Sequence, residues 1–597
     1  MEKIAAKYKA ILEESQTEIE RLNRKVRICM ITRLSLILIL AGSFYLLRDT
    51  ELILLTLSTL FIFTLFIMAV IYNNRLTQRR QRQLSLMQLN KDELSALQYD
   101  FSAFEGRSDL QNPEHPFSLD LDIFGNNSLF QSLNRTILPQ SSDKLAKAFI
   151  EPLEKEENIL LHQAAIHELS QKLELRQSFY VTGKVALKKG IDVNDLLKIS
   201  DTTFSNLSAY IWKFAIYAIP LIWVIIAILT VFGFIPLVVS SLFFPISFVI
   251  ANFKVKQINL LHNKVNKMNE LFSTYAQLLK IVEDADLKSD LNNAIKVKLT
   301  SQNLKASKVI AKLSKHLGAL DQRSNMVIML LNVFILWDIR ISLDILQWFR
   351  KHHKNIPDWF DSLYEFDKLC SLAGFAYNHP KYIYPTIDNN YFRLNGVNVG
   401  HPLMNRDKCI TNSVEFRKSP FFMIITGANM AGKSTYLRTV GVNYLLANMG
   451  LPVFADSFVF FPGKLFTSLR TSDSLVNNES YFFAELKRIK NIIDQLRSDE
   501  KLFIILDEIL KGTNSTDKQR GSKALIKQFA LDGACGIIAT HDLQLGELQK
   551  EFPESIRNFC FEADIKDDQL TFSYKLREGI AENMNACFLM SKMGIIL

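Results

Sequence analysis

Paired cysteines are absent from this sequence. The six cysteines lie far apart along 597 residues, and no two of them form a Cys-x-x-Cys pair. Zinc sites and disulfide frameworks need cysteines at short or regular spacing, so we expect neither. A reducing compartment fits the bulk of the chain best. No small-residue cleavage site follows the charged, amphipathic helix predicted over residues 1–30, so a cleaved signal peptide is not expected.

Charge is scarce in two long stretches. The apolar runs Ile31–Leu47 and Leu52–Tyr72 are joined by a short polar segment, and Ile211–Phe253 contains one charged residue, Lys213, and an internal turn. Crossing a membrane takes about 20 apolar residues, so the sequence predicts four transmembrane helices in two hairpins. Basic residues flank the runs, and the positive-inside rule places both termini in the cytoplasm. A buried core hairpin is the alternative for the first pair.

A third apolar run, Met326–Trp337, has twelve residues. That length is short for a membrane span and predicts a buried helix of a soluble domain. The net charge of +9 suits an anionic membrane surface or a nucleic acid and does not separate the two.

The segment Phe421–Leu437 carries the strongest motif. A buried strand over Phe421–Thr426 is followed by GANMAGKS, which matches G-x-x-x-x-G-K-[ST], and then by a helical pattern that stops at Gly450. Glycines in such a loop let backbone N–H groups surround phosphate oxygens at a helix N-terminus. Lys433 is predicted to reach the β- and γ-phosphates, and the Ser434 hydroxyl to bind Mg²⁺. The motif predicts a site for a nucleoside triphosphate.

Two more apolar strands end in polar residues. Lys501–Leu506 ends in Asp507 and Glu508, the Walker B arrangement, in which the first carboxylate holds the Mg²⁺ shell and the second polarises water. Gly536–Ala539 is followed by Thr540 and His541. A histidine at the carboxyl end of a strand can contact the γ-phosphate or the attacking water.

The residues in these motifs resemble those of the MutS family of DNA mismatch-repair ATPases. The resemblance is carried by TGANMAGKSTYLRTVG, SYFFAE (480–485), LDEILKGTNSTD (506–517) and ATHD (539–542), and more weakly by SLFQSLNRT (128–136), EPL (151–153) and HQ (162–163). It implies an α/β P-loop ATPase domain of the ABC type beside an all-α core and lever domain.

The resemblance also implies roles for individual residues. Lys433, Glu508 and His541 would be catalytic, Ser434 and Asp507 would hold Mg²⁺, and Ser480 would reach the partner's ATP across a homodimer to which Gly512–Thr516 contributes. The residues that would bind ATP are Gly427, Ala428, Asn429, Met430, Ala431, Gly432, Lys433, Ser434, Thr435, Ser480 and Tyr574, the last against adenine.

The match fails near the start of the chain. A Phe-x-Glu motif that would wedge beside a mispaired base is missing, since Phe104 and Glu105 lack its spacing. Mismatch specificity is therefore not expected. The expected organisation is an amphipathic helix (1–30), a first transmembrane hairpin (31–72), a cytoplasmic helical segment that is MutS-like from about 128 (73–209), a second hairpin (210–253), a helical core and lever continuation (254–385) and the ATPase domain (386–597).

The resulting hypothesis is a dimeric, membrane-anchored MutS-like ATPase that uses ATP and Mg²⁺ and binds DNA, located in the bacterial inner membrane. A different class stays open, namely an ATP-driven machine that acts on a lipid, protein or envelope partner without nucleic acid. A scaffold without turnover is the third alternative. Salt-dependent binding to DNA would discriminate the first two.

Overall fold

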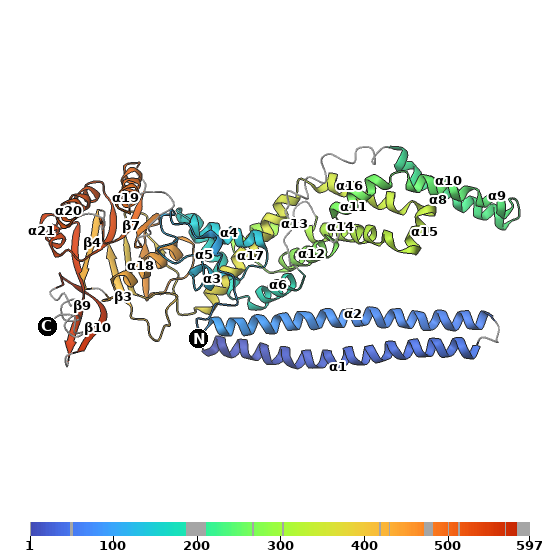
Figure 1. Cartoon of the computed structure of the whole chain (residues 1–597), viewed down its shortest axis with the longest axis horizontal. Helices are drawn as coiled ribbons and strands as arrows, with labels where there is room; N and C mark the ends of the chain where they lie inside the picture. The colour runs from blue at the N-terminus through green and yellow to red at the C-terminus, as the bar shows by residue number, and fades with distance from the viewer. Residues whose placement is uncertain are drawn as a thin grey trace.

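The protein is elongated, with an α/β domain at one end and two helical projections at the other (Figure 1). The structure is a computed structural model that describes residues 2–47, 52–186, 210–265, 268–300, 304–416, 420–428, 430–470, 481–498, 501–510, 514–566 and 569–581. The N-terminus lies against the helical body in the middle of the molecule (Figure 1).

The first projection is an antiparallel pair of long helices, α1 (Glu2–Leu47) and α2 (Leu52–Ala96). Both extend well beyond the predicted apolar runs. At roughly 1.5 Å per residue, each is about 70 Å long, more than twice the hydrocarbon thickness of a bilayer. The large apolar side chains from Ile28 to Leu46 on α1 and from Ile53 to Tyr72 on α2 are mostly exposed. The other half of each helix is polar.

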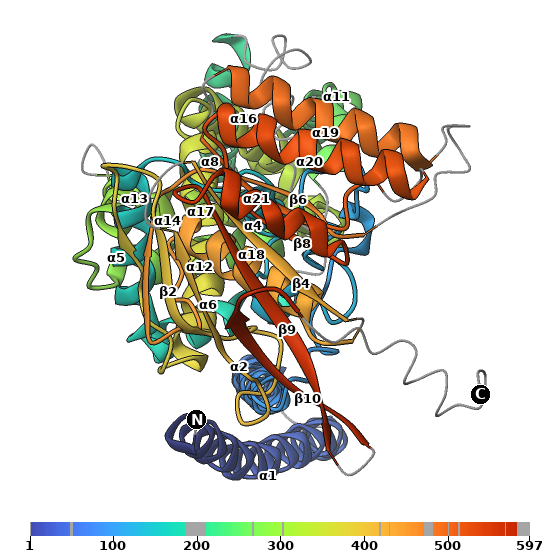
Figure 2. The same cartoon turned by 90° about the vertical axis from the view of Figure 1, so that its left-hand side faces the viewer.

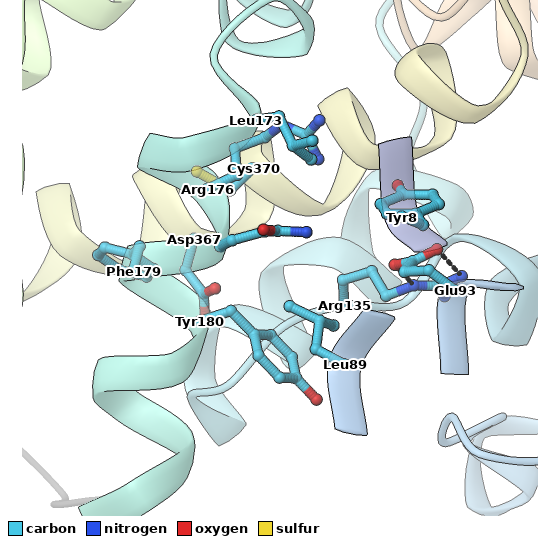
Figure 3. Close-up of a pocket in the computed structure, with 11 residues that line it drawn as sticks. Tyr8, Leu89, Glu93, Arg135, Leu173, Arg176, Phe179, Tyr180, Asp367 and Cys370 are labelled. Atoms are coloured by element: carbon cyan, nitrogen blue, oxygen red, sulfur yellow. Dashed lines mark hydrogen bonds and ion pairs between the residues drawn. The ribbon is translucent and has the colours of Figure 1, made fainter. Parts of the chain in front are cut away.

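The polar half of this projection docks on the helical body through a buried polar network, of which Figure 3 shows Tyr8, Glu93 and Arg135. The Tyr8 hydroxyl donates to Asn378 Oδ1 at 2.8 Å, and Asn378 Nδ2 donates to Glu93 Oε2 at 2.8 Å. The guanidinium of Arg135 is ion-paired with Glu93 at 2.6 Å, and both side chains are less than 10% exposed. The network joins α1, α2 and the body at one point.

The helical body follows the amphipathic pattern of its sequence. In α14, for example, the buried residues recur every three or four positions, which gives one apolar face per helix. The helices of the body are α3 (Leu129–Leu133), α4 (Pro139–Ile150), α5 (Glu156–Ser170), α6 (Leu173–Ala186), α11 (Val255–Val265), α12 (Met268–Asp284), α13 (Asp290–Thr300), α14 (Ala306–Asp321), α16 (Trp337–His352) and α17 (Ile356–Asn378).

The second projection consists of α8 (Tyr210–Val231), α9 (Leu237–Ser241) and α10 (Phe243–Asn252). Its turn lies at the predicted place, with Gly233 at φ 79°. By length and composition, α1, α2 and α8 are long and apolar enough to cross a membrane, and the count rises to five if two bent helix pairs are included. Four complete spans therefore stay a prediction.

The prediction of a buried helix over Met326–Trp337 is wrong. The chain forms α15 (Met326–Ile335), of which only Asn332 and Val333 are buried. Among the described residues, α15 packs closely on α8, α10, α16 and the preceding 3₁₀ turn, and no element covers the rest of its surface. The remaining apolar surface faces outward.

The α/β domain contains two sheets. The smaller one has the order β1-β5-β2-β3, with β1 (Thr386–Ile387), β2 (Leu394–Val399), β3 (Asn412–Phe416) and β5 (Ser457–Phe460). The larger one has the order β10-β9-β4-β8-β7-β6, with β4 (Phe421–Gly427), β6 (Lys464–Ser468), β7 (Leu502–Asp507), β8 (Cys535–Thr540), β9 (Ile556–Lys566) and β10 (Gln569–Glu578).

The larger sheet is parallel except for β10, and helices cover both of its faces (Figure 2). Alternate residues of β4 belong to two separate clusters: Met423 and Ile425 pack on the side of α18 (Lys433–Asn448), whereas Phe422 and Ile424 pack on the other side. That other side is covered by α19 (Tyr481–Arg497), α20 (Ser515–Leu531) and α21 (Leu548–Glu551). Burial on both faces explains why these strands read as continuous apolar runs.

Candidate functional site

Strand register brings the predicted residues to one edge of the larger sheet. Thr426 pairs with Thr540, and Asp507 pairs with Ala539. The carboxyl ends of β4, β7 and β8 therefore meet, and the residues that follow them face the same space. Open α/β sheets bind ligands at this edge.

The glycine loop has the backbone that its sequence predicts. β4 ends at Gly427, α18 begins at Lys433, and Gly432 caps the helix at φ 107°. Gly427 has φ 145°, and a Cβ there would lie 2.3 Å from the Phe561 carbonyl oxygen. A larger residue at either position would be strained or would collide. The predicted strand and helix are confirmed.

The Lys433 ammonium lies inside this loop. Its Nζ donates to the carbonyl oxygens of Gly427 at 2.7 Å and Ala428 at 2.9 Å. The side chain is buried, so the charge is held where phosphate oxygens would enter the loop. The N-terminus of α18 adds the partial positive charge of a helix end.

The two acidic residues at the carboxyl end of β7 lie beside Ser434 and His541. The Ser434 hydroxyl donates to Asp507 Oδ2 at 2.6 Å. His541 Nε2 lies 2.8 Å from Glu508 Oε1 and 3.4 Å from Lys433 Nζ. A proton on Nε2 lets the imidazole donate to Glu508. These five residues, scattered over more than 100 positions, form one connected group.

Non-glycine residues with positive φ cluster around this group. Met430 has φ 63°, Glu508 53°, Leu510 59° and Tyr574 53°. Such conformations are uncommon and cost free energy, and they persist where the surroundings impose them, often at functional sites. The turn after β7 is held by Glu485 of α19, whose carboxylate accepts the Leu510 backbone N–H at 2.6 Å.

A cavity of about 610 Å³ opens in front of the group. Besides the motif residues and Tyr574, its lining includes Met404, Lys408, Cys409, Ile410 and Asn412. The sequence did not single out these residues as ligands, because they come from the smaller sheet and the loop before it. No local spacing connects them to the glycine loop.

Tyr574 stands at a register shift in the β9–β10 ladder. Asn412 fixes this shift, since its Nδ2 donates to the Tyr574 carbonyl at 3.0 Å and its Oδ1 accepts the Leu576 N–H at 2.9 Å. A Cβ on Gly432 would lie 3.1 Å from the Tyr574 ring. The ring therefore borders the glycine loop, and its contact with adenine stays a prediction.

Two further side chains of the cavity are neutral at physiological pH. Burial raises the pKa of the Cys409 thiol and of the Tyr436 phenol. The Tyr436 hydroxyl donates to the Ser413 carbonyl at 3.0 Å. Neither side chain therefore adds a formal charge to the cavity.

Some predicted residues lie outside the described part of the chain. These are Asn429, Ser480, Gly512 and Thr513. The rest of the 512–516 run begins α20: Asn514 caps this helix by accepting the Asp517 N–H at 2.8 Å, and Thr516 is exposed.

The residues present fit a magnesium nucleotide. The cavity volume falls within the range of about 300–1,000 Å³ of small-molecule sites. A buried ammonium and a helix N-terminus suit phosphate oxygens, and a hydroxyl beside a carboxylate suits Mg²⁺, which prefers oxygen ligands.

Comparison with known proteins places this region near one family. Residues 423–592 match the family MutS domain V. Similar proteins include the DNA mismatch repair proteins MutS of Thermotoga sp. (strain RQ2), 29% identical over 238 residues, of Natronomonas pharaonis, 31% over 222 residues, and of Aquifex pyrophilus, 33% over 224 residues.

These matches are confined to part of each protein. They cover 36–39% of this chain and 25–29% of the length of those three relatives. The C-terminal α/β domain is thus related to the MutS family.

Proposed function

We propose that this protein is a membrane-anchored, MutS-like ATPase that works as a homodimer in the bacterial inner membrane. The observation that carries the proposal is the connected group of Lys433, Ser434, Asp507, Glu508 and His541, which lies within the region that matches MutS domain V. ATP hydrolysis with Mg²⁺, dimerisation and contact with DNA all belong to the proposal.

Each residue of the group has a distinct role in this proposal. Lys433 and the backbone N–H groups of the loop bind the phosphates, and Ser434 and Asp507 hold Mg²⁺. Glu508 orients and deprotonates the attacking water, and His541, 2.8 Å away, holds the Glu508 carboxylate in place. Ser480 completes the site from the partner subunit. Mg²⁺ supplies neutralisation of the phosphate charge when it is bound.

Membrane anchoring is supported by the distribution of apolar surface. The exposed apolar side chains of α1, α2, α8 and α10 lie at the end of the molecule opposite the α/β domain (Figure 1). Lys254 Nζ lies over the rings of Trp212 and Phe253 at 5.8 and 5.6 Å, at the polar end of the second projection. Aromatic and basic residues are typical of the membrane interface. The α/β domain would lie in the cytoplasm.

Nucleotide binding by a Lys433→Ala variant tests the site. We expect the affinity for Mg·ATP to fall by roughly 100-fold, because hydrogen bonds to charged groups are worth about 1.5–3 kcal/mol each. The measurement is equilibrium binding of a fluorescent ATP analogue to the detergent-solubilised protein. Lys490→Ala, at an exposed position on α19, is the control. Equal affinities of the two variants for Mg·ATP would show that the nucleotide does not bind at this loop.

The competing function is a membrane machine without nucleic acid. A groove of about 350 Å³ between α12 and α14 favours a polyanion instead, since four lysines, Lys280, Lys305, Lys308 and Lys315, outnumber the two carboxylates, Glu283 and Asp284, in its lining. Among the described residues, only Lys305 of these four is ion-paired, with Asp284 at 3.4 Å. Lys308 and Lys315 are two helical turns apart on one face of α14. We assign the DNA backbone to this groove.

Salt-dependent binding to duplex and branched DNA distinguishes the two functions. We expect the affinity to fall steeply with salt, and the slope of log K against log[salt] to shrink by about 1 for each of Lys308→Ala and Lys315→Ala. Lys91→Ala and Lys147→Ala, at exposed positions outside the groove, are the controls. An absence of binding at low salt, with and without ATP, would favour the membrane machine.

A further inference from the structure

Helix α15 carries an apolar surface that nothing in the described chain covers. Its ten residues, MVIMLLNVFI, contain no charge. Five large side chains on it are between 39% and 74% exposed: Met326, Val327, Met329, Leu330 and Leu331. A surface helix of a water-soluble domain presents a polar face to solvent, and α15 has none.

The opposite side of α15 is packed on the second projection. The Phe334 ring lies 4.7 Å from the ring of Trp223 on α8 and 6.1 Å from that of Phe244 on α10. The Ser247 hydroxyl of α10 donates to the Val333 carbonyl oxygen. The exposed face of α15 is thus continuous with the exposed apolar faces of α8 and α10.

The contact between α15 and the second projection lies farther along α8 than the residues that would mark the membrane interface. Trp212, Phe253 and Lys254 mark the polar end of the projection. At roughly 1.5 Å per residue, Trp223 is about 16 Å farther along α8, a distance comparable to one leaflet of a bilayer core about 30 Å thick. Helix α15 is therefore held at the depth of hydrocarbon if α8 spans the membrane.

The chain enters and leaves α15 on the same side of the molecule. Asn325 caps its N-terminus by accepting the Val327 N–H at 3.0 Å, and the chain turns through Leu336, at φ 50°, into α16 with a bend of 81°. Arg323, before α15, is ion-paired with Asp338, after it, at 3.3 Å. A helix of about 15 Å whose ends are joined in this way cannot cross a bilayer.

We propose that α15 is a re-entrant membrane helix, which inserts its exposed face into the acyl chains of the leaflet nearest the α/β domain, beside α8 and α10. Irregular backbone at membrane depth is tolerated where it is packed on protein, as α15 is. The occupant is hydrocarbon rather than lipid headgroups, because an interfacial helix has a charged face. The proposal rests on the membrane anchoring of α8.

Photo-crosslinking in bilayers tests this placement. A benzophenone amino acid is placed at Met329 of the full chain, reconstituted in phosphatidylethanolamine–phosphatidylglycerol vesicles, and the adducts are identified by mass. Val224, exposed on α8, is the lipid control, and Leu531, exposed on α20, is the aqueous control. We expect lipid adducts at Met329 and Val224, with a yield at least ten times that at Leu531.

The outcomes separate the proposal from the anchoring on which it rests. Lipid adducts at Val224 with none at Met329 would overturn the re-entrant helix and leave the anchoring intact. Protein adducts at Met329 that join two copies of the chain would assign this face to a dimer and would also overturn it. An absence of lipid adducts at both positions would overturn the anchoring as well.

Discussion

Asp367 is a buried carboxyl group with its own consequence for stability. Its Oδ2 accepts the backbone N–H groups of Ile137 at 3.0 Å and Leu138 at 3.1 Å. Burial raises the pKa of Asp367 to about 7, despite these hydrogen bonds, which lower it. The folded state therefore favours the protonated form.

The pH dependence follows from the direction of this shift. A carboxyl group with a raised pKa contributes stability that is fully present below the unfolded pKa, near 4, and is lost as pH rises through about 7. The loss is about 4 kcal/mol. We expect the thermal midpoint of the wild type to fall between pH 5 and 8, relative to Asp367→Asn, whose amide oxygen still accepts both bonds. Equal pH profiles for the two proteins, followed by intrinsic fluorescence, would contradict this.

Single residues also mark the limit of what the sequence predicts. Lys433, Ser434, Asp507, Glu508 and His541 could be predicted, because each directly follows or opens a strand or helix whose apolar pattern is local. Asn412 could not, since its contacts with β10 span 162 or more positions and depend on how two sheets are brought together. The same holds for Tyr8 and Asn378, which are 370 positions apart.

At the scale of elements, a buried ion pair lies at the junction between the α1–α2 hairpin and the body. Arg135 also lies 3.3 Å from the centre of the Phe104 ring, so it is enclosed on several sides. Removing one partner of a buried ion pair leaves the other charge uncompensated, which costs about 3–5 kcal/mol. Losing a single neutral hydrogen bond costs about 1 kcal/mol.

We therefore expect Arg135→Ala to destabilise the docked hairpin much more than Tyr8→Phe. The double variant Arg135→Met/Glu93→Leu is expected to be less destabilised than Arg135→Ala, because no buried charge is left unpaired. Thermal unfolding and protease cleavage between α2 and α3 are the measurements. Lys147→Ala, which breaks the exposed Lys147–Glu151 pair, is the control for a surface ion pair. Indistinguishable single variants would show that the network does not hold the hairpin.

Elements were predicted well where their surroundings are uniform. The strands of the larger sheet are buried on both faces, and their apolar runs identify them from the sequence. Helix α15 was mispredicted because a short apolar run is compatible with a buried helix and with a membrane-exposed one. Which side of α15 is covered, and which is left exposed, depends on its contacts with Trp223, Phe244 and Ser247, far away in the chain.

At the scale of the whole molecule, the α/β domain with its candidate nucleotide site and the apolar projections lie at opposite ends, with the helical body between them (Figure 1). Helix α17, of 23 residues, connects the body directly to the first strand of the α/β domain and carries both Asp367 and Asn378. A change at the sheet edge can reach the projections through this body, and also through the segment after α2, where the Tyr99 hydroxyl accepts the Arg406 N–H at 3.2 Å. The arrangement suits a machine in which ATP binding and hydrolysis move helices. ATP turnover is therefore the central claim of the proposed function.

ATP turnover by the purified full chain tests that claim most directly, with Glu508→Gln as the comparison. We predict Mg²⁺-dependent hydrolysis by the wild type and a loss of roughly 100-fold or more in the variant, since a positioned general base contributes about 10²–10⁴-fold. The variant should still bind ATP and accumulate as an ATP-bound dimer. Turnover that persists in a Glu508→Gln protein that binds ATP, or a wild type that binds ATP and never hydrolyses it, would contradict the account.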